Sequence, residues 1–433
     1  MTRGRRRRGA MRAVPLLVPL VLEISSVSFG IELWSNEETR NSLSLDASLK
    51  CTGLASRAPD DPIFSPERES RIGLLRFRLG LGARFAESAN IMFAYEQRLR
   101  VSSRYAGAGM GAGVLPAEAK VPFRSRQLDW QIDASSDDTY TYRHEIDRAF
   151  LALHPSWGEF SIGRQAIGLG RGVLFSAVDV FSPFSPLEVD REWRRGVDAV
   201  RLEYRASGTA SAEIIGAFGE HWDESALLGR VRGIFGNVDG ELLFGKRARD
   251  RMYAGTLSAA VGDAEAHLEL AVFDVPERHP DGGPFCDDRL VGKTVLGGSY
   301  TFGVGDGLTL LAEYHYSGFG SEDVEDASAR LVMDPVFMKR YLRGDFQIFS
   351  QHAAALRASY MVSSTWTASL LVIGSPEDGS GVASPSLTWD VAENVSFVAS
   401  AFVPWGAEPS GGRIESEYGG APLSLFLQIS VYF

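Results

Sequence analysis

Arginine, glutamate and histidine recur at every second residue in several segments of this chain. That spacing places them on one face of a β-strand, where they could line a water-filled passage. Arginine dominates the first rows, and acidic residues dominate several later ones. The members are Arg76, Arg78, Arg84, Glu96, Arg98, Arg100, Arg201, Glu203, Arg205, Glu241, His267, Glu269, Glu313, His315 and Arg357. Two interpretations stay open: a wall divided by sign would orient polar solutes in a transverse field, whereas pairing across neighbouring strands would only keep the interior wet.

Residues that could catalyse hydrolysis or hold a metal are not arranged to do so. His315 and Ser317 share a strand face, as a base and a nucleophile would, but no third residue that would orient the histidine is evident. The segment 220–223 (Glu-His-Trp-Asp) is isolated in a loop. The seven histidines lack metal-ligand spacing, and the glycine-rich segment 303–307 joins two strands instead of opening a helix. The sequence therefore predicts no enzyme, no metal site and no cofactor.

The polar rows alternate with apolar residues along almost the whole chain. Between Gly73 and Phe85, for example, leucine and phenylalanine occupy the face opposite the arginines. We count about eighteen such segments of about nine to fifteen residues, close to the 9–11 that a membrane-crossing strand needs and longer than most soluble strands. They are residues 40–51, 70–85, 88–103, 140–154, 158–167, 196–206, 210–220, 227–235, 238–247, 250–261, 264–274, 290–303, 307–318, 350–363, 365–374, 382–391, 394–404 and 422–433. The pattern predicts an all-β fold, a transmembrane antiparallel β-barrel.

The connections between these segments alternate in length, which is typical of short periplasmic turns and long extracellular loops. The loop 168–195 is too apolar for water, so we expect it to fold into the lumen and narrow it. The loop 319–349 covers the mouth and has near-helical apolar spacing over 322–343. Cys51 and Cys286 map to long loops, where a disulfide is possible but not required.

The two ends of the chain carry export signals. A basic block up to Arg8, an apolar run from Ala13 to Leu22 and small residues up to Gly30 follow the order of a secretory signal. We therefore expect residues 1–30 to be a cleaved signal peptide and 31–433 to form one barrel domain in the outer membrane of a Gram-negative bacterium. The last strand ends in Tyr432 and Phe433, which resembles the signal recognised by the outer-membrane barrel assembly machinery.

The composition excludes other classes of protein. A net charge of −11 and a pI near 5.3 argue against a nucleic-acid partner, which usually needs a basic face. Beyond residue 30, no run approaches the roughly 18 apolar residues of a membrane-spanning helix. The predicted partners are outer-membrane lipid, the assembly machinery and small solutes.

One segment carries a more specific pattern. It contains Gly163, Arg164, Gln165, Gly168, Gly170, Arg171, Gly172, Phe175, Asp179, Phe181, Ser182, Pro183, Arg191, Arg194, Arg195, Gly196, Val197 and Asp198. This run resembles one found in outer-membrane porins related to the alginate-export family, although Leu169 departs from the Trp-Gly that relatives often carry. The resemblance implies an 18-stranded passive porin with an arginine-rich channel for anionic or polyhydroxylated solutes. The residues themselves indicate a strand, a glycine-rich turn and an inward loop anchored by Arg194 or Arg195.

The sequence thus predicts an outer-membrane porin that passes small polar solutes, anionic or polyhydroxylated, by passive diffusion. A barrel plugged by its own loops, with a structural or adhesive role, is the alternative from another class. An outer-membrane hydrolase is a third candidate with less support. Substrate identity and oligomeric state are not predicted.

Overall fold

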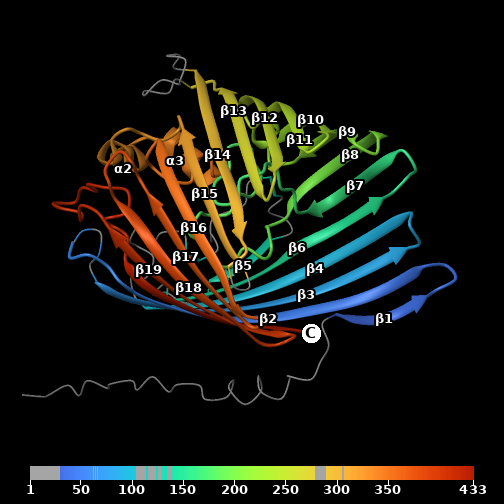
Figure 1. Ribbon diagram of the computed structural model, residues 1–433, viewed down its shortest axis with the longest axis horizontal. Coiled ribbons are helices and arrows are strands. Elements are labelled where there is room, and N and C mark those ends of the chain that lie inside the picture. Colours follow the sequence, from blue (N-terminus) through green and yellow to red (C-terminus); the bar gives the residue numbers. More distant parts are fainter. Residues whose placement is uncertain are drawn as a thin grey trace, which may run out of the picture.

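The structure is a computed structural model that describes residues 30–61, 63, 65, 67–103, 114–115, 123–124, 129–133, 139–277, 289–304 and 307–433. It is a closed antiparallel barrel of eighteen strands (Figure 1), which confirms the predicted fold class. The barrel strands are β2 (Asn41–Arg57), β3 (Glu69–Phe85), β4 (Ala89–Ser102), β6 (Tyr140–Leu153), β7 (Gly158–Gln165), β8 (Val197–Ser207), β9 (Ala210–Ala217), β10 (Ala226–Phe235), β11 (Val238–Arg247), β12 (Asp250–Val261), β13 (Ala264–Asp274), β14 (Leu290–Phe302), β15 (Leu308–Ser317), β16 (His352–Ser363), β17 (Trp366–Gly374), β18 (Gly381–Ala392), β19 (Val395–Trp405) and β20 (Leu423–Tyr432).

The barrel closes where β2 pairs with β20, between Ser48–Tyr432 and Arg57–Leu423. Closure leaves no open edge in the wall, as hydrocarbon surroundings require. Tight connections such as Ala86–Ser88 and Gly262–Asp263 lie at one end, called here the short-turn end, and the longer connections lie at the other, the long-loop end. Among the described residues, no helix combines the length and apolarity needed to cross a membrane.

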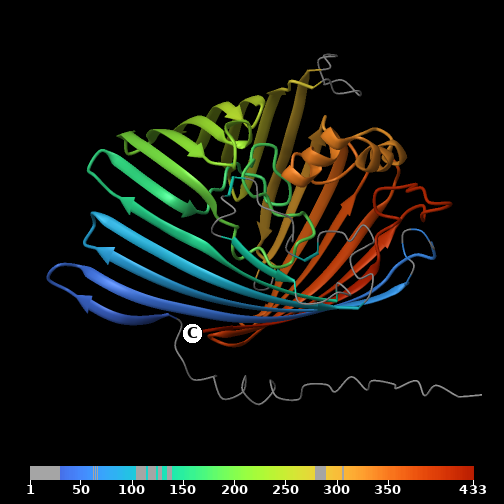
Figure 2. The same ribbon diagram turned by 180° about the vertical axis from the view of Figure 1, so that it is seen from behind.

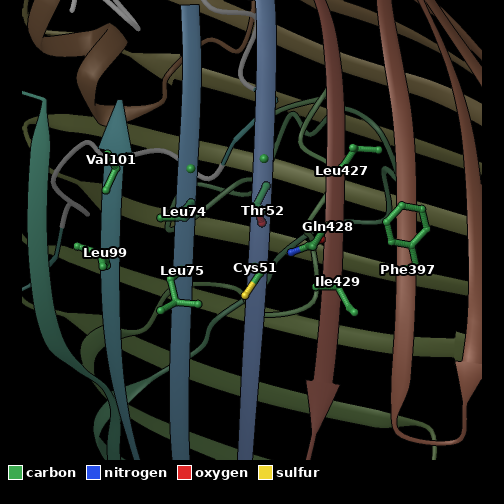
Figure 3. A pocket seen from close by; sticks show the side chains of 12 residues that line it. Cys51, Thr52, Leu74, Leu75, Leu99, Val101, Phe397, Leu427, Gln428 and Ile429 are labelled. Carbon is green, nitrogen blue, oxygen red and sulfur yellow. The ribbon is translucent and has the colours of Figure 1, made fainter. Parts of the chain in front are cut away.

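Strand β2 corrects the prediction for Cys51. The strand continues beyond it to Arg57, because residues 52–57 pair with both β3 and β20. Cys51 therefore lies within the wall, as a free thiol on its outward face, and not in a loop. Figure 3 shows it between Leu75 and Ile429, in a shallow outward hollow where two paired glycines leave room. Cys286 and all but the last residue of the predicted signal 1–30 lie outside the described residues.

Two short strands join the sheet in addition to the predicted ones. β1 (Ile31–Asn36) pairs with β2 beyond the point where β20 ends, at the short-turn end (Figure 1). β5 (Asp129–Asp133) pairs with the part of β6 that extends past the end of β7. Both continue an edge that a longer strand leaves unpaired, and their five or six residues are too short for the membrane-strand pattern.

The mouth loop contains two helices instead of one. α2 (Val324–Met333) and α3 (Pro335–Arg343) are separated at Asp334, whose carboxylate caps α3 by accepting from the backbone of Val336 and Phe337. Proline at the first position of α3 lacks the N–H that would continue α2. A one-turn 3₁₀ helix, η2 (Trp222–Glu224), lies in the loop between β9 and β10.

The outward face of the strands is apolar. Leu370, Leu387 and Leu427 are 44%, 39% and 41% exposed. Their inward neighbours along each strand are polar or packed inside the barrel. Val431 shares the outward parity of Leu427 but is only 3% exposed, beside Leu49 and Val395. Val431 is therefore shielded by its neighbours, unlike the other outward residues of β20, although the sequence pattern places it in the same lipid-facing row.

Candidate channel and constriction loop

The segment between β7 and β8, residues 166–196, folds back inside the barrel and is called here the constriction loop (Figure 2). Most of its apolar side chains are buried, and Leu174, Phe175 and Phe181 are at most 3% exposed. They pack in one cluster with inward residues of the wall such as Phe273 and Val295. The apolar side chains that led us to expect an inward-folded loop are thus buried against the inside of the wall.

Two carboxylates of the barrel wall hold residues 171–178 of this loop. Glu269 on β13 accepts hydrogen bonds from the backbone of Arg171, Gly172, Ala177 and Val178. Glu313 on β15 accepts from the backbone N–H groups of residues 173, 174 and 175 at 2.6, 2.9 and 2.9 Å. Loop donors that would otherwise be buried without partners are therefore satisfied by the wall.

Gly170 lies directly beside the Glu269 carboxylate. It has a φ of +92°, and a Cβ atom there would lie 2.3 Å from a Glu269 carboxylate oxygen. Only glycine combines this backbone conformation with so close a contact. The glycine at this position of the 163–198 motif is therefore explained by the packing of the loop against the wall, and no bound ligand is needed to account for it.

The far end of the loop crosses the interior to the opposite wall. Asp190 binds Lys50 of β2 at 2.7 Å and Arg76 of β3 at 2.8 Å, and accepts from Gln428 of β20 at 3.2 Å. The ring of Trp193 stacks under the Lys50 ammonium group, 4.2 Å from the ring centroid. The loop therefore spans the barrel from β13 and β15 to β2, β3 and β20.

Other motif residues form ion pairs at the base of the loop, within it and between it and the wall. Arg164 forms a two-pronged pair with Asp198 at 2.7 and 2.9 Å, and Gln165 donates to the Ala199 carbonyl. The other pairs are Arg171 with Asp239 and Glu241, Arg194 with Asp179, and Arg195 with Glu145. The sequence left open whether Arg194 or Arg195 anchors the loop: Arg195 contacts Glu145 of β6, whereas the Arg194 guanidinium binds Asp179 and the Ser182 carbonyl within the loop itself.

The charged rows pair across strands and are not divided by sign. On β8 to β11 the pairs run from Arg201 to Glu213, to Arg230, to Glu241, while Arg232 binds Asp239 at 2.6 Å. On β3 and β4, Arg76 and Arg98 both contact Glu96, and Arg78 binds Asp147 at 3.1 Å. The geometry follows the pairing interpretation, since cross-strand neighbours of opposite charge lie within reach of each other.

Several residues expected to line the channel face inward but are covered. Arg76, Arg78, Glu96, Arg98, Glu313 and His315 are at most 6% exposed. His315 stacks on Phe175 of the loop, with ring centroids 5.0 Å apart, so it does not line an open passage. Ser317 is also fully buried, so the arrangement offers no access to a hydrolase substrate.

The other predicted lining residues keep some exposure. Arg84, Arg100, Arg201, Glu203, Arg205 and Arg357 are half-buried or exposed. Arg201 and Arg205 have carboxylate neighbours. In the described part of the chain, Arg84, Arg100 and Arg357 have no carboxylate within salt-bridge distance. The sequence could not show which inward arginines are paired, because pairing depends on which residue of the neighbouring strand lies opposite each of them.

The mouth loop is fixed to the rim by a buried charge cluster. Asp345 contacts Arg247 of β11 and Arg343, and Asp250 binds Arg340 at 3.1 Å and Arg343 at 2.8 Å. Burial alone would raise the pKa of Asp345, but the surrounding guanidinium groups hold it well below its usual range. Both charged side chains of the Arg-Gly-Asp tripeptide at 343–345 are engaged in these ion pairs, so they are not available to bind a partner protein.

Two further carboxylates tie neighbouring long loops together. Glu417 accepts from the backbone of Phe349 and Ser350 at 3.0 and 2.8 Å, and Glu377 accepts from the backbone of Gln351. Burial, reinforced by nearby Glu417, raises the pKa of Glu377 to about 7, and burial raises that of Glu417.

Loop packing around Glu377 should weaken as the pH rises through about 7. Its folded pKa lies above the unfolded value of about 4.3, so the stability it contributes is complete below that value and is lost as pH rises through the folded pKa. The protection of residues 345–352 against hydrogen exchange, taken relative to the intrinsic exchange rate at each pH, should therefore be lower at pH 8 than at pH 6. Glu377→Gln should flatten this difference in protection, and Glu415→Gln, at an exposed position, should not. Equal protection at both pH values in the unmodified protein would contradict the prediction.

No family model and no curated protein matches this chain by sequence. Its structure is similar to OccAB1 of Acinetobacter baumannii, with a TM-score of 0.56, 7% identity and coverage of 93% of this chain and 98% of the other. It is also similar to OccK9 of Pseudomonas aeruginosa, with a TM-score of 0.54, 12% identity and coverage of 90% and 98%. The outer membrane protein OpdK of Pseudomonas aeruginosa matches with a TM-score of 0.50, 10% identity and coverage of 90% and 98%. At these identities the likeness establishes that the chain shares the barrel fold of these proteins.

Proposed function

We propose that this chain is an outer-membrane porin that passes small polar solutes by passive diffusion. The observation that carries the proposal is a loop folded inside a closed barrel and anchored at both ends of its span, by Glu269 and by Asp190. Eighteen strands enclose more space than wall side chains can fill, and such a loop sets the width of what remains. The shared fold with an outer membrane protein supports the same conclusion.

Planar-bilayer recordings test this function. The purified barrel should give a steady, passive conductance that is proportional to voltage at low field. A barrel plugged by its loops, the alternative with a structural or adhesive role, should give none. Absence of current from correctly folded protein would overturn the porin proposal.

The proposal includes export and assembly. Residues 1–30 would be removed as a signal peptide, and β20 with Tyr432 and Phe433 would be read by the assembly machinery. The finer relation to porins of the alginate-export family is supported by the motif in residues 163–198 alone. The motif residues serve as anchors of the constriction loop, so the motif supports a shared loop architecture and not a particular solute.

The channel should prefer anions modestly, through Arg100 and Arg357. Replacing both with glutamine should shift the reversal potential in a salt gradient toward cation preference, because both are inward guanidinium groups that lack a salt-bridge partner among the described residues. The shift should fade as salt screens charges beyond about 8–10 Å. Arg251→Gln, on the outward face, is the control. An unchanged reversal potential at low salt would refute the anion preference and leave the porin function standing.

A further inference from the structure

Six hydroxyl-bearing residues lie in one row across six neighbouring strands, β14 to β19. Each is the register partner of the next, and the row is called here the hydroxyl belt. Its members are Thr301, Thr309, Ser359, Ser369, Ser386 and Ser400. Strands in a sheet are about 4.8 Å apart, so the belt extends about 24 Å around the wall.

The belt is on the inward face. Strand neighbours of its members, such as Leu370 and Leu387, are among the exposed apolar residues of the outer surface, and side chains alternate between the two faces. Ser359, Ser369 and Ser386 are themselves half-buried. Their hydroxyl groups therefore belong to the interior wall and keep access to its space.

The wall from β17 to β20, which carries one half of the belt, is almost free of charge. Strands β17 to β20 contain a single charged residue, Asp390. By contrast, β8 to β11 carry the ladder of ion pairs from Arg201 to Asp239. The belt therefore runs from β14 to β16, whose inward charged residues include Lys293, Glu313 and Arg357, into a neutral wall on β17 to β19.

The central hydroxyl groups of the belt are uncommitted. Thr301 bonds Thr309 at 3.0 Å and Ser400 bonds Ser386 at 2.8 Å, which uses the ends of the row. Among the described residues, the side chains of Ser359 and Ser369 make no hydrogen bond. The polar contacts of the constriction loop fall on β13, on β20 and, within the belt strands, on Glu313 of β15, four residues from Thr309. Two neighbouring hydroxyls therefore remain free to donate to and accept from a solute.

We propose that the hydroxyl belt is the solute-binding wall of the channel and that it favours neutral polyhydroxylated solutes, such as open-chain polyols. This inference rests on the proposed porin function and names its solute class. A row of hydroxyl groups can exchange hydrogen bonds with successive hydroxyls of a solute without holding any of them tightly. Weak, repeated binding of this kind suits passage, because a solute must be able to leave each position.

Uptake into proteoliposomes tests the belt. The ratio of mannitol flux to triethylene glycol flux compares a solute rich in hydroxyls with an ether of similar size. Ser359→Ala combined with Ser369→Ala should lower this ratio about three- to tenfold, as expected for the loss of a weak hydrogen bond. The matched control is Ser211→Ala combined with Ser258→Ala, which removes two inward hydroxyls from β9 and β12, outside the belt.

The outcomes separate the belt from the channel. A lower flux ratio in the belt variant only, with potassium chloride conductance unchanged in both variants, supports the proposal. Equal ratios in the two variants, with conductance retained, overturn the belt and leave the porin function intact. Absence of both conductance and solute uptake from the unmodified protein overturns the porin function, and the belt as a solute wall with it.

Discussion

Replacing Glu269 and Glu313 together with glutamine should release the constriction loop and turn a small, steady conductance into a larger and noisier one. The two carboxylates accept seven backbone N–H groups of the loop. A glutamine side chain presents an NH₂ group to half of these donors, and two donors cannot bond each other. Hydrogen bonds to charged groups contribute about 1.5–3 kcal/mol each, so the double variant should lose the anchoring of this half of the loop.

Single-channel recording and hydrogen exchange together measure this effect. Protection of residues 171–178 should fall while the strands stay protected, since the wall does not depend on the loop for its own backbone pairing. Glu265→Gln is the control, because Glu265 lies on the same strand and bonds His267 without touching the loop. Unchanged conductance and unchanged protection would show that apolar packing alone holds the loop in place.

The barrel itself could be predicted because each membrane strand has one face toward lipid and one toward the interior, and its residue types alternate accordingly. All eighteen predicted segments are strands, and most ends agree within a few residues. The period-2 pattern is strong because lipid selects apolar residues on one face. It failed at β2, where small and polar residues after Cys51 blurred the contrast. It also could not show that Pro335 and Asp334 divide the mouth helix, although both residue types are ordinary helix-start signals.

The interior could be predicted only in part. Alternation gives the face of each residue, but not its partner across the register or the loop that covers it. Arg76 and Arg357 occupy equivalent inward positions in the sequence pattern. Arg76 is buried against Asp190, more than one hundred residues away, whereas Arg357 has no such partner among the described residues. The hydroxyl belt was missed for a related reason: its serines and threonines are unremarkable singly and align only once the register of six strands is known.

A positive charge on the lipid-facing row should impair assembly far more than the same charge one residue away. Leu387 and Ser386 are adjacent on β18, and their side chains point to opposite faces of the wall. Leu387 is 39% exposed on the outward face, where an arginine near the middle of the bilayer costs about 2–4 kcal/mol. Ser386 points into the barrel, where water can solvate the charge.

Leu387→Arg should therefore reduce the folded, heat-modifiable form in membranes, and its unfolding free energy in vesicles should fall by about 2–4 kcal/mol. Ser386→Arg should assemble close to normally, although it should disturb polyol passage. Equal assembly of the two variants would show that the faces of β18 are wrongly assigned, and the belt would then lie on the lipid side. The pair thus tests the orientation on which both the channel and its hydroxyl-lined wall depend, without relying on any transport measurement.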